Sequence, residues 1–256
     1  KSGKSGKSDK LKELEEKFLF ARPDGVALPL TAQWRFQKLE AFRNVQRGVF
    51  YISRLPDRLD WSCGRVKESR AVLPGEVTPV TSMMLGQVSW NGMIPKDGAF
   101  PTKPRLSIKP LREADLMRAR KIIQDMSCSA REVVVSNINS VSAHTDVGFR
   151  SRGSDKIQAN PFSKLYDGQK KFAVDKKGMP TLRPAELMHG DVVLMEFSIG
   201  RYWDESKDGR VLNWNSNRVY FHLEAATLLV QGSEDGADAP ANKMAAKGYS
   251  SMEEYF

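Results

Sequence analysis

The sequence predicts an α+β fold that is mainly antiparallel β, and three observations support this prediction. Residues 191–199 and 217–230 alternate apolar and polar side chains, with the period of two that is typical of half-buried strands. The polar segment between them contains Asp208-Gly209, a turn signal, so the two strands are expected to form an antiparallel hairpin with a long tip. Residues 110–126 show helical spacing instead.

The N-terminal half contains helices first and strands afterwards. Residues 9–20 predict a short helix, and residues 31–44 predict a second helix with imperfect apolar periodicity. Residues 49–52, Val-Phe-Tyr-Ile, are aromatic and β-branched and predict a strand. Weaker strand candidates follow at 65–73 and 84–94, where Pro and Gly residues separate them.

The segment 110–126 is the most regular helix of the chain. Pro110 suits the first helical turn, because its missing N–H has no partner there in any helix. One face carries the apolar residues Leu116, Ala119, Ile123 and Met126. We therefore expect this helix to pack on the core, and residues 132–142 to form a further strand after it.

The last hairpin offers a polar face as well as a buried one. In 217–230, Val219, Phe221 and Leu223 share one phase, while Tyr220, His222 and Glu224 share the other. In 191–199, Val193, Met195, Phe197 and Ile199 share a phase opposite to that of Glu196 and Ser198. One face of the hairpin is thus predicted to be buried and the other available.

Residues 150–183 form a basic stretch, with nine Lys and Arg against three Asp. The stretch is also rich in Gly, Ser, Asn and Pro, which predicts a long loop and not a packed element. Loops of this length inside a compact domain are usually functional or disordered. We therefore treat the stretch as a candidate binding segment.

Composition excludes several classes of protein. The chain has 256 residues, of which 40% are hydrophobic, enough for a core and too many for a wholly disordered chain. No apolar run approaches the roughly 20 residues of a membrane-spanning helix. Two cysteines, Cys63 and Cys128, are too few for a disulfide scaffold, and both are expected to be reduced, small buried side chains. Without a visible secretory signal, we expect an intracellular protein, nuclear or cytoplasmic.

Three regions are predicted along the chain. Residues 1–20 are a basic arm with a short helix, 21–232 a single β-rich domain, and 233–256 an acidic linker and C-terminal tail. The arm begins KSGKSGKS, but the spacing of its GKS elements is not that of a phosphate-binding loop.

The net charge of +9 favours a polyanionic partner, with nucleic acid first. Aromatic and basic residues are interleaved around the last hairpin, as single-strand binding requires: rings stack on bases and cations follow phosphates. The candidate nucleic-acid-binding residues are Arg150, Arg152, Lys170, Lys171, Arg201, Tyr202, Trp203, Arg210, Trp214 and Tyr220. This hypothesis is non-catalytic and needs no cofactor; an oligomer is compatible with it.

A resemblance points the same way. The stretches HGDVVLMEFSIGRYW and VYFHLEAATLLVQG, within residues 191–232, resemble the closing hairpin of OB-fold nucleic-acid-binding proteins and segments of uncharacterised fungal proteins. The resemblance implies an elaborated OB-like barrel that binds single strands through one sheet face and its loops. It implies that the binding region is lined by Tyr202, Trp203, Trp214 and Tyr220.

Two other classes of function remain open at this stage. His144-Thr145-Asp146 is an HxD pair like that of iron(II)/2-oxoglutarate-type oxygenases, with a later histidine, His189 or His222, as the third ligand. The alternative interpretation is a polar turn in which Asp146 accepts hydrogen bonds from the local backbone. The basic arm is also compatible with a structural or assembly subunit. GxSxG and GxGxxG are both absent from the sequence, which disfavours an α/β-hydrolase nucleophile and a dinucleotide fold.

Overall fold

The computed structural model describes residues 30–62, 68–128, 139–150, 157–203 and 217–232. Its helices are α2 (Leu30–Glu40), α3 (Glu113–Met126) and the short 3-10 turns η1 (Ile52–Arg54) and η2 (Pro184–Glu186). Its strands are β1 (Arg43–Asn44), β2 (Val49–Tyr51), β3 (Asp60–Trp61), β4 (Glu68–Val72), β5 (Thr81–Asn91), β6 (Arg105–Pro110), β7 (Val141–His144), β8 (Gly148–Arg150), β9 (Ile157–Ala159), β10 (Leu165–Asp167), β11 (Val192–Trp203) and β12 (Asn217–Val230).

Five strands close on themselves into a barrel. The pairing runs β5–β6–β7–β12–β11 and returns to β5 through the β5–β11 pair. Four of these pairings are antiparallel, and β7–β12 is parallel. The predicted α+β fold, mainly antiparallel and built on a barrel, is confirmed. Closure leaves no free edge on these five strands along their paired lengths.

Strand β11 connects the barrel to an extension of the sheet. Its first part, Val192 to Ser198, pairs with β5, whereas Gly200 to Tyr202 pair with β4. Strand β3 then pairs with β4 and ends the sheet. The outer face of the barrel therefore continues without a break from β12 over β11 onto β4.

The core lies inside the barrel, as the hairpin alternation predicts. Phe197 and Phe221 are almost fully buried, and their ring centroids are 4.6 Å apart. Along β12 burial alternates as predicted from Val219 to Leu223. On β11 the prediction of an available polar face is wrong: Glu196 and Ser198 are only 9% and 1% exposed, because other segments cover this part of the strand.

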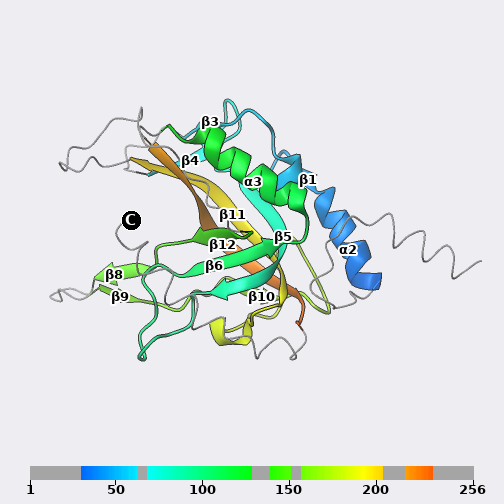
Figure 1. Cartoon of the computed structure of the whole chain (residues 1–256), viewed down its shortest axis with the longest axis vertical. Helices are drawn as coiled ribbons and strands as arrows, with labels where there is room; N and C mark the ends of the chain where they lie inside the picture. Colours follow the sequence, from blue (N-terminus) through cyan, green and yellow to red (C-terminus); the bar gives the residue numbers. More distant parts are fainter. Residues whose placement is uncertain (1–29, 63–67, 129–138, 151–156, 204–216, 233–256) are drawn as a thin grey trace, which may run out of the picture.

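Both described helices pack against one flank of the barrel, and the β8–β9 ribbon projects on the other side (Figure 1). The predicted helix start at Pro110 is wrong, since Pro110 is the last residue of β6 and α3 begins at Glu113. Helix α3 is joined to β2 by a buried hydrogen bond, in which the Tyr51 hydroxyl donates to Asp115 Oδ2 over 2.6 Å. Helix α2 ends at Glu40, earlier than predicted, because the next residues pair as β1.

The basic stretch is not one long loop. Strand β10 lies within it, pairs in parallel with β12, and buries Leu165 in the core. Lys176 is a buried member of the stretch: it forms an ion pair with Glu196 of β11, and both side chains are only 11% exposed. The segment after β10 is therefore packed against the barrel.

Several other predictions concern the remaining residues. The helix at 9–20, the arm, the tail, most of the predicted strand at 132–142 and Cys63 lie outside the described residues. Cys128 is exposed, so the prediction that it is buried is wrong.

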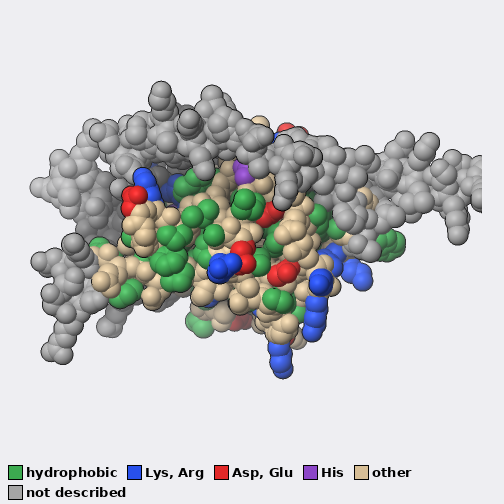
Figure 2. All heavy atoms as spheres, turned by 90° about the horizontal axis from the view of Figure 1, so that it is seen from below, with side chains coloured by type: hydrophobic (Ala, Val, Ile, Leu, Met, Phe, Trp, Pro, Cys, Tyr) green, Lys and Arg blue, Asp and Glu red, His purple; other side chains and the backbone are tan. Residues whose placement is uncertain are grey.

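No helix among the described residues is long and apolar enough to cross a membrane. Viewed from below, hydrophobic, basic and acidic side chains lie side by side (Figure 2), so charge is not segregated on that face.

Candidate nucleic-acid interface

The outer face of the barrel carries a group of aromatic and basic side chains where β12, β11 and β7 meet. On β12 the outward phase contains Arg218, Tyr220 and His222, because their neighbours Val219 and Phe221 point into the core. Tyr202 of β11 pairs with Arg218 and His144 of β7 pairs with His222. We call the following residues the aromatic–basic face: Arg70, Arg105, His144, Tyr202, Arg218, Tyr220 and His222.

Tyr220 is the centre of this face. Its ring stacks on the His144 imidazole, with centroids 5.0 Å apart and an angle of 26° between the planes. Tyr202 approaches the same ring at 5.8 Å in a tilted arrangement. His222 contacts it edge-on at 6.4 Å. Three strands thus contribute four rings to one contiguous surface.

Arg70 reaches this cluster from β4. Its Nη1 donates a hydrogen bond of 2.5 Å to the Tyr220 hydroxyl, and its guanidinium carbon lies 5.3 Å from the Tyr220 ring centroid. The side chain crosses β11 at Gly200, where an added Cβ would lie 2.6 Å from Tyr220 Cε1 and would also overlap Arg70 Nη1. Glycine at this position is what allows the arginine and the phenol ring to meet.

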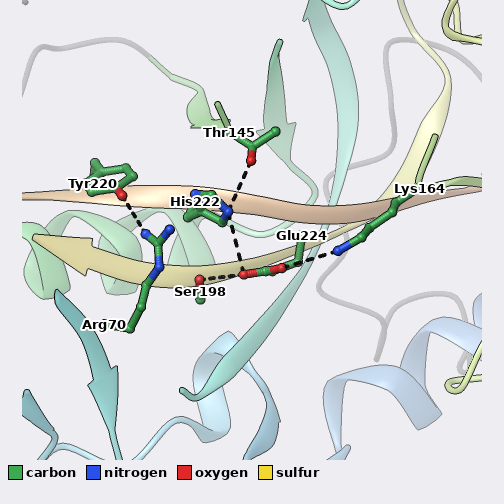
Figure 3. A network of polar contacts seen from close by, with 7 residues as sticks. All are labelled: Arg70, Thr145, Lys164, Ser198, Tyr220, His222 and Glu224. Atoms are coloured by element: carbon green, nitrogen blue, oxygen red, sulfur yellow. Dashed lines mark hydrogen bonds and ion pairs between the residues drawn. The ribbon is translucent and has the colours of Figure 1, made fainter. Parts of the chain in front are cut away.

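His222 belongs to a polar network that continues along β12 (Figure 3). Its Nε2 is 3.1 Å from Thr145 Oγ1 and 4.0 Å from Glu224 Oε1. Glu224 accepts a 2.8 Å hydrogen bond from the Ser198 hydroxyl and lies 3.8 Å from Lys164 Nζ. Ser198 and Lys164 thus hold the Glu224 carboxylate next to His222, at one end of the aromatic–basic face.

The face is positively charged as well as aromatic. Arg105 of β6 is in register with His144, and Arg218 is in register with Tyr202. With Arg70 this places three guanidinium groups among four rings, all of them partly exposed. Guanidinium groups bind phosphate oxygens in bidentate fashion, and flat rings stack on bases.

The structure brings Tyr202 and Tyr220 together, as their shared outward phase suggests. It places Arg201 elsewhere, because successive residues of a strand point to opposite faces. The Arg201 guanidinium lies 4.5 Å from the Trp61 ring centroid, on the side of β11 away from Tyr220. Desolvation at this half-buried position lowers the pKa of Arg201 below its ordinary value.

Of the other predicted residues, Lys170 and Lys171 lie away from this face. Lys170 and Lys171 are exposed, but they follow β10 at the end of the barrel next to α2, where Arg35 of α2 donates to the carbonyl oxygen of Gly168 over 2.6 Å. Arg150 is the last residue of β8, and Trp203 is the last residue of β11. The predicted residues Arg152, Arg210 and Trp214 lie outside the described residues.

Sequence reasoning missed part of the face. The alternation of β12 puts Arg218 and His222 in the same outward phase as Tyr220. This pattern is visible in the sequence and could have identified both residues. Arg70 and Arg105 had no such signal, because their places depend on which strands pair with β11 and β7.

The metal-site alternative gains no support. Asp146 Oδ1 accepts a hydrogen bond of 2.9 Å from the Gly148 amide, as in the polar-turn interpretation of the HxD pair. His189 is exposed in the turn between η2 and β11, and the ring next to His144 across the β7–β12 pair is that of His222. Within the described ranges, no group of three His, Cys, Asp or Glu residues is arranged to hold a metal ion.

Comparison with known proteins gives matches among solved structures alone. No protein-family model and no curated protein matches the chain. The chain is similar to the single-stranded DNA-binding protein gp2.5 of bacteriophage T7, with 15% identity over 63% of this chain and 95% of that one and a TM-score of 0.37. It is also similar to the single-stranded DNA-binding protein of bacteriophage Enc34, with 10% identity over 74% and 99% and a TM-score of 0.36. At TM-scores this low, the similarities carry no conclusion about function.

Proposed function

We propose that this protein binds nucleic acid without catalysis, and that it prefers single strands. The binding surface is the aromatic–basic face on the outside of the barrel. The observation that carries the proposal is the contact of Tyr220 with Arg70 and His144, which assembles a cation and two rings from three different strands. A ligand that matches this surface has both stackable faces and regularly spaced negative charges.

Single strands fit this surface better than duplexes. The rings of Tyr202, His144 and Tyr220 can stack only on bases whose faces are accessible, and a duplex hides those faces within its own stack. Arginines alone would bind either form through its phosphates. A preference for single strands is thus the specific consequence of having rings among the cations.

The experiment is fluorescence anisotropy with labelled single-stranded and duplex oligonucleotides over a salt series. We expect binding that weakens linearly on a log–log plot against salt and still favours the single strand at high salt. The single-strand preference should be reduced in Tyr220→Ala. If the protein loses its binding to single-stranded and duplex oligonucleotides equally at moderate salt, the surface is merely basic. An absence of binding to either form would refute the proposal.

A further inference from the structure

We propose that Trp90 is a second base-stacking platform, so that a bound single strand crosses the β-strands from β5 towards β4. This inference rests on the proposed function and extends its site by a residue on another strand. Trp90 is one of the large hydrophobic side chains that remain exposed, at 39% of its surface. Trp90 lies in the last part of β5, two residues before Gly92.

The indole is supported from below by Gly92. A Cβ added to Gly92 would overlap the six-membered ring of Trp90, so the ring lies directly against the backbone of this glycine. The Gly92 amide donates to the carbonyl oxygen of Arg105 over 2.9 Å, which fixes the glycine beside β6. One side of the indole is therefore packed on backbone while a large part of the ring stays exposed, which is the arrangement a base-stacking surface needs.

The strand pairing places Trp90 on the same side of the sheet as Tyr220. Trp90 pairs with Ser107 of β6, whose hydroxyl is 2.6 Å from that of Ser142 on β7. Ser107 points outward, because its neighbours Leu106 and Ile108 are fully buried in the core. Trp90 thus lies on the same side of the sheet as the outward residues of β6, β7 and β12. Ser107 itself is only 5% exposed, and Arg105 and Ser142 are the more exposed residues on this side of β6 and β7.

Two arginines are interspersed among the rings along this path. Gly92, under the indole, is hydrogen-bonded to Arg105; Arg105 is in register with His144; and His144 stacks on Tyr220, which holds Arg70. From β5 to β4 the path crosses five strand spacings of about 4.8 Å, or roughly 24 Å. Such a path matches a strand at the short end of the range of about 4–16 nucleotides for a barrel of this kind.

The test compares full-length wild type, Trp90→Ala, Trp90→Phe and Gly92→Ala in anisotropy titrations with oligothymidylates of about 4 and about 12 nucleotides. We expect Trp90→Ala to weaken binding of the longer oligonucleotide about 5- to 100-fold, the range that corresponds to loss of one stacked base. The shorter one should lose affinity as well, because an oligonucleotide of about 4 nucleotides already matches the length of the path from β5 to β4. Trp90→Phe should retain most of the affinity, and Gly92→Ala should lose part of it because the added methyl displaces the indole.

The matched control is Trp34→Ala, since Trp34 is an exposed tryptophan on α2 and lies outside the path. Circular dichroism melts of every variant establish that each is folded. If wild type binds and Tyr220→Ala weakens binding while Trp90→Ala equals wild type, the inference is overturned and the proposed function stands. An equal loss in Trp34→Ala would also overturn it. If wild type binds no oligonucleotide, both the inference and the proposed function are overturned.

Discussion

Arg70 on β4 donates a hydrogen bond to the Tyr220 hydroxyl on β12, although β11 lies between their two strands. The bond is 2.5 Å long, and Gly200 of β11 leaves the space through which the two side chains meet. The position of a cation on this face therefore depends on a phenol hydroxyl and on a missing side chain. Each of these two features can be changed separately.

Removal of the Tyr220 ring is the most direct test of the face. Tyr220→Ala should weaken single-strand binding about 5- to 100-fold and change stability little, because the ring is partly exposed. Tyr220→Phe keeps the ring but removes the hydroxyl that holds Arg70. Its loss of single-strand affinity should therefore be smaller and confined to the electrostatic, salt-dependent part of that affinity. Anisotropy at two salt concentrations separates these effects. Tyr166→Ala, on β10 at the other end of β12, is the control; affinity unchanged in Tyr220→Ala would argue against the assignment.

Gly200→Ala tests the space between Arg70 and Tyr220. The added methyl group would collide with both side chains, and overpacking of this kind costs roughly 1–3 kcal/mol. We expect a lower melting temperature together with weaker single-strand binding. The comparison variant is Gly75→Ala. An added Cβ at Gly75 would meet no atom within 4 Å, although the backbone φ of 80° there is unfavourable for alanine. A folded Gly200→Ala protein with wild-type affinity would mean that Arg70 does not need its observed position.

The salt dependence of binding reports how many cations meet phosphates. For single strands, the slope of log affinity against log salt is about 0.7 per neutralised phosphate. Arg105→Gln and Arg218→Gln should each make the slope shallower by about 0.7 if each arginine contacts one phosphate. Arg201→Gln, on the opposite side of β11, should leave the slope as it is. A slope change in Arg201→Gln equal to the other two would contradict the face as defined.

The buried pair of Tyr51 and Asp115 predicts a pH-dependent stability. Burial raises the pKa of Asp115 above its ordinary value of 3.8, so the folded protein holds this proton more tightly than the unfolded chain. The stabilisation is therefore present at low pH and is lost as pH rises from 3.8 through the folded pKa. Asp115→Asn keeps an oxygen that can accept from Tyr51 and removes this dependence, so its advantage over wild type should grow with pH.

Urea unfolding of wild type and Asp115→Asn at several values between pH 4 and pH 8 measures this difference. Asp191 and Glu196 also have pKa values raised chiefly by burial, and they contribute equally to both proteins. The difference between the two proteins therefore reports Asp115 together with Glu40, since the Asp115 charge adds to the effect of burial that raises the pKa of Glu40. A difference that is constant or shrinks with rising pH would refute the assignment.

The ion pair of Lys176 and Glu196 predicts a non-additive pair of substitutions. Lys176→Met leaves a buried carboxylate without its cation, which typically costs about 3 kcal/mol or more when the pair is fully buried. Glu196→Gln in the same chain removes that charge, so the double variant should be more stable than Lys176→Met alone. Chemical denaturation of the four proteins of the cycle gives the coupling energy. If the changes in unfolding free energy of the two single variants simply add up to that of the double variant, the interaction between Lys176 and Glu196 contributes nothing to stability.

Local pattern was enough to predict the two long strands and the inward position of their aromatic residues. Phe197 and Phe221 are core residues, and Tyr202 and Tyr220 share the outer face, because an alternating strand leaves only two choices for each side chain. The helix at 113–126 followed from its spacing in the same way, apart from its first turn. There β6 extends to Pro110, since pairing with β5 outweighs the helical preference of an N-terminal proline.

The composition of the candidate face was decided by strand pairing. Arg70 meets Tyr220 only because the end of β11 leaves β5 and pairs with β4, and His144 meets it only because β7 pairs in parallel with β12. Neither pairing leaves a trace in local sequence, since both join segments far apart in the chain. Tertiary structure likewise took Lys176 from a presumed loop into a buried ion pair, whereas strand alternation alone places Arg201 on the face opposite to Tyr202. The sequence determined which side chains of each strand share the outward phase, and the closure of the barrel decided which of them lie together.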